Sequence, residues 1–151
     1  MRAGLSFEPI DAGNVARYVP LYVAVFNAPP WNDGWTEAAA FERLGGFASE
    51  ARFLGVGALF QGQPVGLALG HGERWTDRWL FQLREMCVAT ACQGQGVGRA
   101  LMANFEAELR GAGYGTVYLQ TGQDAPARAF YEAAGFVPYG HVPMHKHLVP
   151  A

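Results

Sequence analysis

Charged residues and cysteines are both scarce in this sequence of 151 residues, and each scarcity narrows the class of protein that it encodes. Only 16% of the residues are charged while 50% are hydrophobic, a balance that argues against a disordered chain. The formal net charge is −2 and no basic run is present, so nucleic acids and anionic membrane surfaces are not expected as partners. No apolar run approaches the length of a membrane span, and residues 1–9 lack an apolar signal core.

The two cysteines, Cys87 and Cys92, fit neither a disulfide framework nor a zinc-binding spacing. We therefore expect two reduced thiols in a cytoplasmic protein. His145 and His147 would point the same way from a strand, but no third ligand accompanies them, so no metal site is expected. The length, together with the absence of repeats and low-complexity tracts, predicts one domain over residues 1–151.

The spacing of apolar residues predicts an α+β fold with a mixed, mostly antiparallel central sheet and helices on both faces. Helices are expected from Asn14 to about residue 26, from Thr36 to about residue 46, and over residues 97–111 and 126–134. Strands are expected at residues 5–10, 52–61, 64–71, 79–88, 116–121, 136–141 and 144–148. The second and third of these strands are joined by a two-residue turn at Gly62-Gln63.

A glycine-rich segment at residues 93–99 joins the strand that ends at Val88 to the longest predicted helix, and this arrangement predicts an anion site. The first N–H groups of a helix have no intrahelical acceptor, and glycine lets a phosphate approach the backbone. A dinucleotide-binding turn would need glycine where Arg99 stands, and a phosphate loop would need a Gly-Lys-Ser/Thr ending. Neither is present. A turn without a ligand is the alternative.

Two motifs resemble those of one protein family. Gln93-x-x-Gly96-x-Gly98 resembles the acetyl-coenzyme A (acetyl-CoA) signature Q/R-x-x-G-x-G/A of the GNAT superfamily of N-acetyltransferases. The segment from Asp124 to Phe136 resembles the last helix of that family, N-x-x-A-x-x-L/F-Y-x-x-x-G-F, and follows at the expected distance. Asp124 departs from the pattern, because the family usually has asparagine there.

This resemblance implies a GNAT-like fold and an enzyme that transfers an acetyl group directly from acetyl-CoA to the primary amine of a small molecule. Acetylation of a protein or peptide amine stays open, as does a non-catalytic acyl-CoA sensor or interaction module. A homodimer through the terminal strands also stays open. The implied coenzyme contacts, of which the first three are made by main-chain groups, are Met86, Cys87, Val88, Gln93, Gly94, Gln95, Gly96, Val97, Gly98, Arg99, Asp124 and Tyr131.

Acetyl transfer to an amine needs a base near the nitrogen and a proton donor near the leaving sulfur. By resemblance, Tyr131 is the donor; a core aromatic packed beside Phe130 is the alternative. Glu85 is the candidate base, because it stands on an otherwise apolar strand side with Phe81, Leu83 and Cys87, where desolvation would raise its pKa. A structural ion pair is the alternative, with Arg78, Arg84 or Arg99 as its partner. His71 or a chain of water molecules is an alternative base.

The acceptor amine is expected to meet two segments rich in aromatic and acidic residues, 29–35 and 71–77. Aromatic faces and carboxylates suit an amine cation, although the aromatics are equally explained by a loop that packs on the core. The candidate acceptor residues are Trp31, Asp33, Trp35, His71 and Glu73.

Overall fold

The computed structural model describes residues 3–150, and these form two compact units that divide after Gln120. The first unit holds all five strands and the helices α1 (Val19–Phe26), α2 (Glu37–Ala48) and α3 (Val97–Gly111). The second unit holds α4 (Pro126–Ala133), after which residues 134–150 form neither helix nor strand. None of the helices in the described residues is long and apolar enough to span a bilayer.

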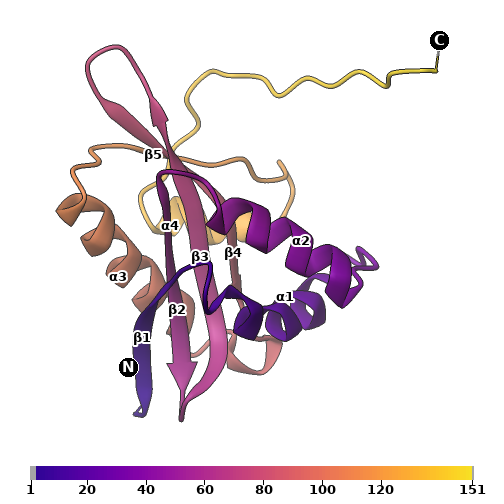
Figure 1. Ribbon diagram of the computed structural model, residues 1–151, viewed down its shortest axis with the longest axis vertical. Helices are drawn as coiled ribbons and strands as arrows, with labels where there is room; N and C mark the ends of the chain where they lie inside the picture. The colour runs from indigo at the N-terminus through magenta and orange to yellow at the C-terminus, as the bar shows by residue number, and fades with distance from the viewer. Residues whose placement is uncertain (1–2, 151) are drawn as a thin grey trace. The chain divides into compact units, whose positions relative to one another are not determined.

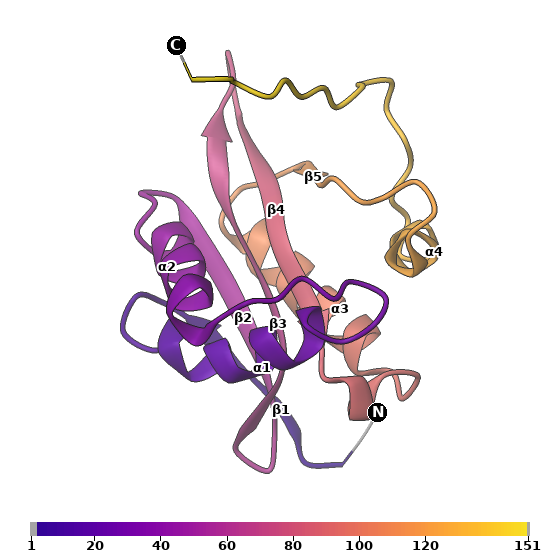
Figure 2. The same ribbon diagram turned by 90° about the vertical axis from the view of Figure 1, so that its right-hand side faces the viewer.

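The sheet has the strand order β1-β2-β3-β4-β5. The strands β1 (Leu5–Ile10), β2 (Phe53–Phe60), β3 (Gln63–Arg74) and β4 (Trp79–Val88) are antiparallel neighbours, and β5 (Val117–Tyr118) runs parallel to β4. Within this unit α1 and α2 lie on one face of the sheet and α3 lies on the other (Figure 1). Figure 2, turned by 90°, looks onto the face with α1 and α2. The predicted mixed, mostly antiparallel sheet with helices on both faces is confirmed.

The face beneath α1 and α2 is shaped by a buried tyrosine. Tyr18 belongs to the short 3-10 helix η1 (Val15–Tyr18) and lies so close to Gly57 of β2 that a Cβ there would overlap the phenol. Its hydroxyl donates a hydrogen bond of 2.5 Å to Glu8 Oε1. Burial first, and the Glu8 carboxylate second, raise the pKa of Tyr18 well above its usual range, so the phenol stays a donor. A glycine thus makes room for an aromatic side chain that is buried and satisfied.

The opposite face is covered by α3 with the predicted stripe of residues four apart. Val97, Leu101, Phe105 and Leu109 are all buried. The Phe105 ring meets Phe81 of β4 edge to face at 5.5 Å between centroids, and Tyr114 meets the same ring at 5.2 Å. The helical spacing read from the sequence therefore identified the core face of α3 correctly.

A β-bulge in β4 moves Glu85 to the other face of the sheet from Leu83. Leu69 of β3 pairs with Glu85, and Gly70 pairs with Leu83, so Arg84 is an extra residue between the two pairs. Neighbouring residues of β3 face opposite sides, and directly paired residues share a side. The prediction that positions 81, 83, 85 and 87 share one side is therefore wrong. Phe81 and Leu83 face α3, whereas Glu85 and Cys87, after the bulge, face α1 and α2.

Other boundaries of helices and strands differ from those predicted from the sequence. The hairpin turn consists of Gln61 and Gly62, with φ values of 51° and 79°, so it lies one residue earlier than predicted. Such left-handed backbone at both positions suits a tight hairpin turn. The helix α2 continues through Gly45 and Gly46 to Ala48, and β5 is shorter than the predicted strand at residues 116–121.

The two predicted terminal strands, at residues 136–141 and 144–148, are not strands in the structure. Pro138 has no N–H to give to a strand ladder, and Gly140 adopts a φ of 81°, outside the extended region. Both features interrupt the first of the two segments. Among the described residues no strand pairs with the second segment, and an unpaired extended segment is not a strand.

Replacing Gly70 with alanine is expected to lower the free energy of unfolding by about 1–3 kcal/mol, because a Cβ there would overlap the Gln82 carbonyl at the bulge. Equilibrium unfolding in urea measures the loss. Gly45→Ala is the matched control: an added Cβ inside α2 has nothing within 4 Å and should stabilise the helix by up to about 1 kcal/mol. A G70A protein as stable as the wild type would mean that the bulge tolerates a side chain.

Candidate active site

A buried carboxylate, Glu85, lies at the centre of the candidate site. It is 8% exposed and accepts two hydrogen bonds, from Arg43 Nε at 2.5 Å and from the Tyr22 hydroxyl at 3.1 Å. The three residues come from β4, α2 and α1, so the bulge in β4 brings the carboxylate to the two helices. A buried charge needs such partners, since an unpaired carboxylate would be strongly destabilising.

The two oxygens of the Glu85 carboxylate are in different situations. Both hydrogen bonds go to Oε1, and no residue within 3–150 donates a hydrogen bond to Oε2. Among these residues no buried side-chain oxygen or nitrogen lacks a hydrogen-bond partner, so Oε2 keeps contact with solvent. One oxygen is therefore fixed by the protein, and the other is open to a water molecule or a ligand.

The surroundings raise the pKa of Glu85 above its ordinary value. Desolvation by burial is the largest cause, and it outweighs the opposing effects of Arg43, Tyr22 and the charge of Arg84. Desolvation, followed by the charge of Glu85, also raises the pKa of Tyr22, which keeps its phenol protonated as a donor to Oε1. A carboxylate of this kind is a better proton acceptor than an exposed glutamate.

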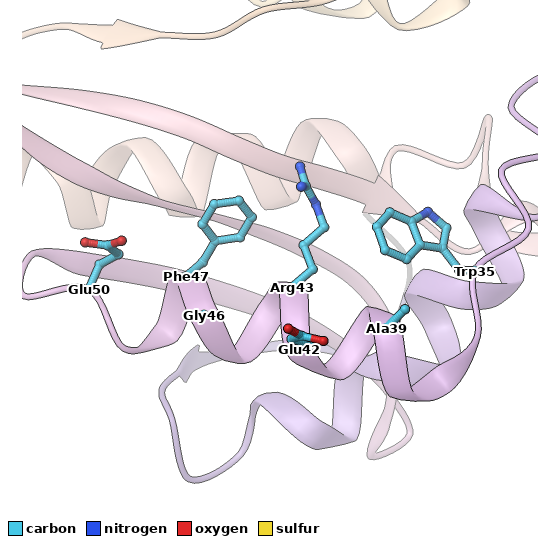
Figure 3. Close-up of a pocket in the computed structure, with 7 residues that line it drawn as sticks. All are labelled: Trp35, Ala39, Glu42, Arg43, Gly46, Phe47 and Glu50. Carbon is cyan, nitrogen blue, oxygen red and sulfur yellow. The ribbon is translucent and has the colours of Figure 1, made fainter. Parts of the chain in front are cut away.

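Aromatic rings border the Arg43 guanidinium. Its central carbon lies 5.0 Å from the centroid of Phe47 and 5.9 Å from that of Trp35, and Figure 3 shows Arg43 rising between these two rings from α2. The Arg84 guanidinium lies 5.3 Å from the same Phe47 ring, and His71 stacks on it at 6.4 Å. An open pocket of about 470 Å³ adjoins this cluster and is lined by Trp35, Ala39, Glu42, Arg43, Gly46, Phe47 and Glu50.

The predicted acceptor residues divide into two groups. Trp35 and His71 lie in the aromatic cluster beside Arg43 and Phe47. Trp31 instead packs on Phe26, and Asp33 accepts a hydrogen bond of 3.2 Å from Trp35 Nε1. Glu73 lies at the C-terminal end of β3, where it accepts a hydrogen bond of 2.9 Å from the Gln82 side chain.

The glycine turn has the open backbone that an anion site needs. Gly94 and Gly96 adopt φ values of 76° and 83°, and an added Cβ on either would have nothing within 4 Å. The first hydrogen bond of α3 runs from Ala100 N to Gly96 O at 3.0 Å, so the N–H groups of residues 97–99 precede the helical ladder. These features fit a phosphate at the N-terminus of α3.

The two glutamines of the turn brace its backbone. Gln93 donates through its side chain to Val88 O at 3.1 Å, and Gln95 donates to Ala91 O at 3.0 Å. The first bond spans the 3-10 helix η2 (Thr90–Cys92), which links β4 to the turn. In the structure these amides therefore order the path from the strand to the helix.

The end of β4 leaves backbone groups without a strand partner. Within residues 3–150, β5 pairs with β4 only at Phe81 and Gln82, whereas β3 pairs with β4 as far as Val88. The stretch Leu83–Val88 thus has one edge with no neighbouring strand. This stretch includes Met86, Cys87 and Val88, the residues expected to contact the coenzyme through the main chain. An extended ligand finds hydrogen-bonding groups at such an edge.

The remaining predicted residues belong to the second unit. Tyr131 lies on α4, where its ring meets Phe130 at 5.5 Å and Phe136 at 5.7 Å. Asp124 precedes that helix, and Arg128 binds Glu132 at 2.6 Å one helical turn further on. The structure therefore gathers Glu85, the open edge of β4 and the glycine turn in one unit, and Tyr131 and Asp124 in the other.

Sequence reasoning missed the partners of Glu85. The ion pair is made by Arg43, rather than by Arg78, Arg84 or Arg99; Arg84 acts on Glu85 only through its charge. Tyr22 falls within the helix predicted from Asn14 to about residue 26, and nothing in the sequence marks it as a partner of Glu85. The contacts from Tyr22 and Arg43 to Glu85 span 63 and 42 residues of chain, and no local pattern signals them. Within residues 3–150, no group of three or more histidine, cysteine or acidic side chains is arranged to hold a metal ion.

Comparison with known proteins identifies this arrangement of elements. The model of the acetyltransferase (GNAT) family matches residues 18–136. Among solved structures, an aminoglycoside acetyltransferase, meta-AAC0020, from an uncultured soil metagenomic sample in complex with sisomicin has a TM-score of 0.75 and 18% identity, over 97% of each chain. No curated protein matches the sequence.

Two further structures have the same fold. The aminoglycoside N-acetyltransferase AAC(6′)-Iy in complex with CoA has a TM-score of 0.76 and 13% identity, over 95% of this chain and 94% of the other. A ribosomal-protein-alanine N-acetyltransferase from Brucella melitensis biovar Abortus 2308 has a TM-score of 0.75 and 14% identity, over 96% of this chain and 99% of the other. At these identities the likeness is one of fold.

Replacing Arg43 with methionine is expected to raise the pKa of Glu85 further and to cost about 1–2 kcal/mol of stability at pH 7.5. The cost is less than for a fully buried pair, because Arg43 is 38% exposed. A folded-state pKa above the unfolded value of about 4.3 means that stability is greatest below the unfolded pKa and falls as pH rises through the folded one.

The difference in urea midpoint between R43M and the wild type should therefore shrink as the pH is lowered from 7.5 to 4.5. Arg110→Met is the control, because it removes an exposed i,i+4 pair with Glu106 and should change stability by less than about 0.5 kcal/mol at either pH. A loss in R43M that does not vary with pH would contradict the assignment of the ion pair to Glu85.

Proposed function

The chain belongs to the GNAT acetyltransferase family, and on this basis we propose that it is an acetyl-CoA-dependent N-acetyltransferase that acts on the primary amine of a small molecule. One observation carries the proposal. Along the chain from β4 to α3 lie the buried Glu85 carboxylate, the main chain at the end of β4 that has no further strand partner among the described residues, and the open glycine turn. A base, an edge for an extended ligand and a phosphate cradle thus follow one another along the chain.

The first unit offers complementary places for the parts of the coenzyme. N–H groups of residues 97–99 and the open backbone of Gly94 and Gly96 would hold the pyrophosphate. The main-chain groups of Met86, Cys87 and Val88 would bind the pantetheine arm, with one N–H directed at the thioester oxygen to stabilise the charge that develops there. In the second unit Asp124, as a carboxylate, can only accept hydrogen bonds from the coenzyme. Acetyl-CoA supplies the activated acetyl group.

Glu85 would remove the proton from the acceptor amine. An alkylamine has a pKa of about 10.4, so its deprotonation costs roughly 4–5 kcal/mol at pH 7. The open Oε2 of Glu85 can take this proton directly or through a water molecule, while Arg43 and Tyr22 hold Oε1 in place. The raised pKa of Glu85 brings the carboxylate closer to the basicity that this step requires.

Tyr131 would give a proton to the departing thiolate, since a phenol is a donor at neutral pH. Cys87 takes no covalent part in the proposed reaction. Burial, followed by the charge of Glu85, raises the pKa of its thiol well above the usual range, so little thiolate is present at neutral pH. Transfer therefore passes directly from the coenzyme to the amine.

Calorimetric titration with acetyl-CoA, with NADH as the control ligand, tests the coenzyme assignment. Binding of acetyl-CoA alone is expected, and Gly96→Val should weaken it at least about tenfold by closing the backbone to the pyrophosphate. Gly113→Val is the matched control, because Gly113 also has a positive φ, of 90°, and open space, but follows the other end of α3. Equal affinity of wild type and G96V would place the pyrophosphate elsewhere, and binding without turnover on any amine would favour an acyl-CoA sensor.

Replacing Glu85 with glutamine should lower kcat/KM at pH 7 by about 10²–10³ and change the shape of the pH profile. The wild-type rate should rise with pH through the raised pKa of Glu85. The E85Q rate should instead follow the free amine and rise about tenfold per pH unit toward pH 10, so that the two enzymes converge at high pH. Glu106→Gln is the control, because Glu106 is half-exposed on α3, on the other face of the sheet from Glu85. Parallel profiles of E85Q and the wild type would assign the base to another group.

A further inference from the structure

We propose that the acceptor amine carries a carboxylate and that Arg84 binds it, so that the substrate resembles an amino acid rather than a polycationic sugar. This inference rests on the proposed acetyltransferase function and specifies the substrate class of the same site. The argument depends on the position of one cation, on the charges around it and on the aromatic surface beside it.

Arg84 makes no hydrogen bond or ion pair with the described residues. Among the arginines that the structure describes, all except Arg84 and Arg99 make an ion pair or a hydrogen bond within the protein. Arg99 lies in the turn proposed to hold the pyrophosphate. Arg84 is exposed and is itself the extra residue of the bulge, directly before Glu85. Among the described residues, the two arginines that make no hydrogen bond or ion pair thus lie at the two places where the proposed chemistry requires an anion.

The charges around Glu85 leave Arg84 available for a ligand. Arg43 is committed to Glu85 by a contact of 2.5 Å, so this pair is internally compensated. Arg84 is close enough for its charge to act on Glu85, but it does not reach the carboxylate with a hydrogen bond. The acids that line the nearby pocket, Glu42 and Glu50, are both exposed, where water and salt screen them.

The aromatic surface lies next to Arg84. The Phe47 ring is 5.3 Å from the Arg84 guanidinium carbon and 5.0 Å from that of Arg43, and the His71 ring stacks on it at 6.4 Å. The side chain of a small ligand can pack on such a surface. A guanidinium forms two parallel hydrogen bonds with a carboxylate, which gives orientation as well as affinity.

These groups together define an acceptor with two ends. Its carboxylate would bind Arg84, its amine nitrogen would approach Oε2 of Glu85, and its carbon chain would lie over Phe47. An acceptor with several ammonium groups and no anion would instead place a positive charge beside Arg84, which disfavours binding. The step itself is the proposed acetyl transfer: the C–N bond forms, the thioester C–S bond breaks, the amine proton passes to Glu85 and the thiolate receives a proton.

The test compares pairs of amines that differ in the carboxylate, namely 4-aminobutyrate with butylamine and phenylalanine with 2-phenylethylamine. The wild type should prefer the carboxylate member at least about tenfold in kcat/KM. Arg84→Gln should raise KM for that member about 10- to 100-fold and affect its partner far less, and Arg84→Lys should restore part of the loss. Taking the ratio of wild type to R84Q for each amine cancels the intrinsic reactivity of the amine.

Arg110→Gln is the matched control, since it removes an exposed arginine on α3, away from these residues. An equal effect of R84Q on both members of each pair, with acetylation intact, would overturn the carboxylate site and leave the proposed function standing. A wild-type preference for the amine without a carboxylate, or for an aminoglycoside, would also overturn it.

Calorimetric titration of the amines into the protein saturated with CoA separates the two claims, because it does not require turnover. Binding of 4-aminobutyrate or phenylalanine that R84Q weakens at least tenfold supports the site even if no acetylated product forms, in which case only the proposed function fails. Absence of such binding from the wild type, in protein shown by circular dichroism to be folded, overturns the site.

Discussion

The extra residue in β4 determines on which face of the sheet the candidate base Glu85 lies. Without the bulge at Arg84, Glu85 would share the side of Leu83 and face the packed interior beneath α3. With it, the carboxylate faces α1 and α2 and meets Tyr22 and Arg43. The absence of a side chain at Gly70 permits the close approach of the Gln82 carbonyl at this point. Bulges commonly redirect side chains next to functional sites, and this one directs a charge away from an apolar core.

The environment of Glu85 balances two opposing requirements. Burial makes the carboxylate more basic, which suits proton transfer, but it also disfavours the charged form that accepts the proton. Hydrogen bonds from Arg43 and Tyr22 stabilise the charged form, and both bonds go to the same carboxylate oxygen, Oε1. The partial exposure of Arg43 keeps the arrangement in contact with water. The Glu85 carboxylate is thus held in a fixed orientation, while its Oε2 remains available to a ligand or a water molecule.

The sequence predicted the features that depend on neighbouring residues. Val97, Leu101, Phe105 and Leu109 repeat at helical spacing, and the glycines after Gln93 require a turn, so the sequence alone predicts both features. The bulge was not, because Phe81, Leu83 and Cys87 repeat at the period of a regular strand, and such a local pattern gives no sign of an inserted residue.

Features that depend on distant segments were also missed. Arg43 lies on α2, far from Glu85 along the chain. An arginine in a helical pattern gives no sign of the carboxylate with which it pairs. The terminal strands were predicted in segments with apolar residues such as Phe136 and Leu148, but apolar residues alone do not supply a strand to pair with. Strand formation depends on such a neighbour, which a local pattern cannot specify.

The edge of β4 between Leu83 and Val88 has a further consequence for how the protein behaves in a cell. A row of backbone N–H and C=O groups without a strand partner is a template on which another chain can pair, and proteins generally cover such edges. A ligand that occupies the edge therefore also acts as its cover. A ligand at a hundred times its dissociation constant adds about 2.7 kcal/mol to the folded state. The abundance of that ligand would then govern the lifetime of the protein as well as its rate of turnover.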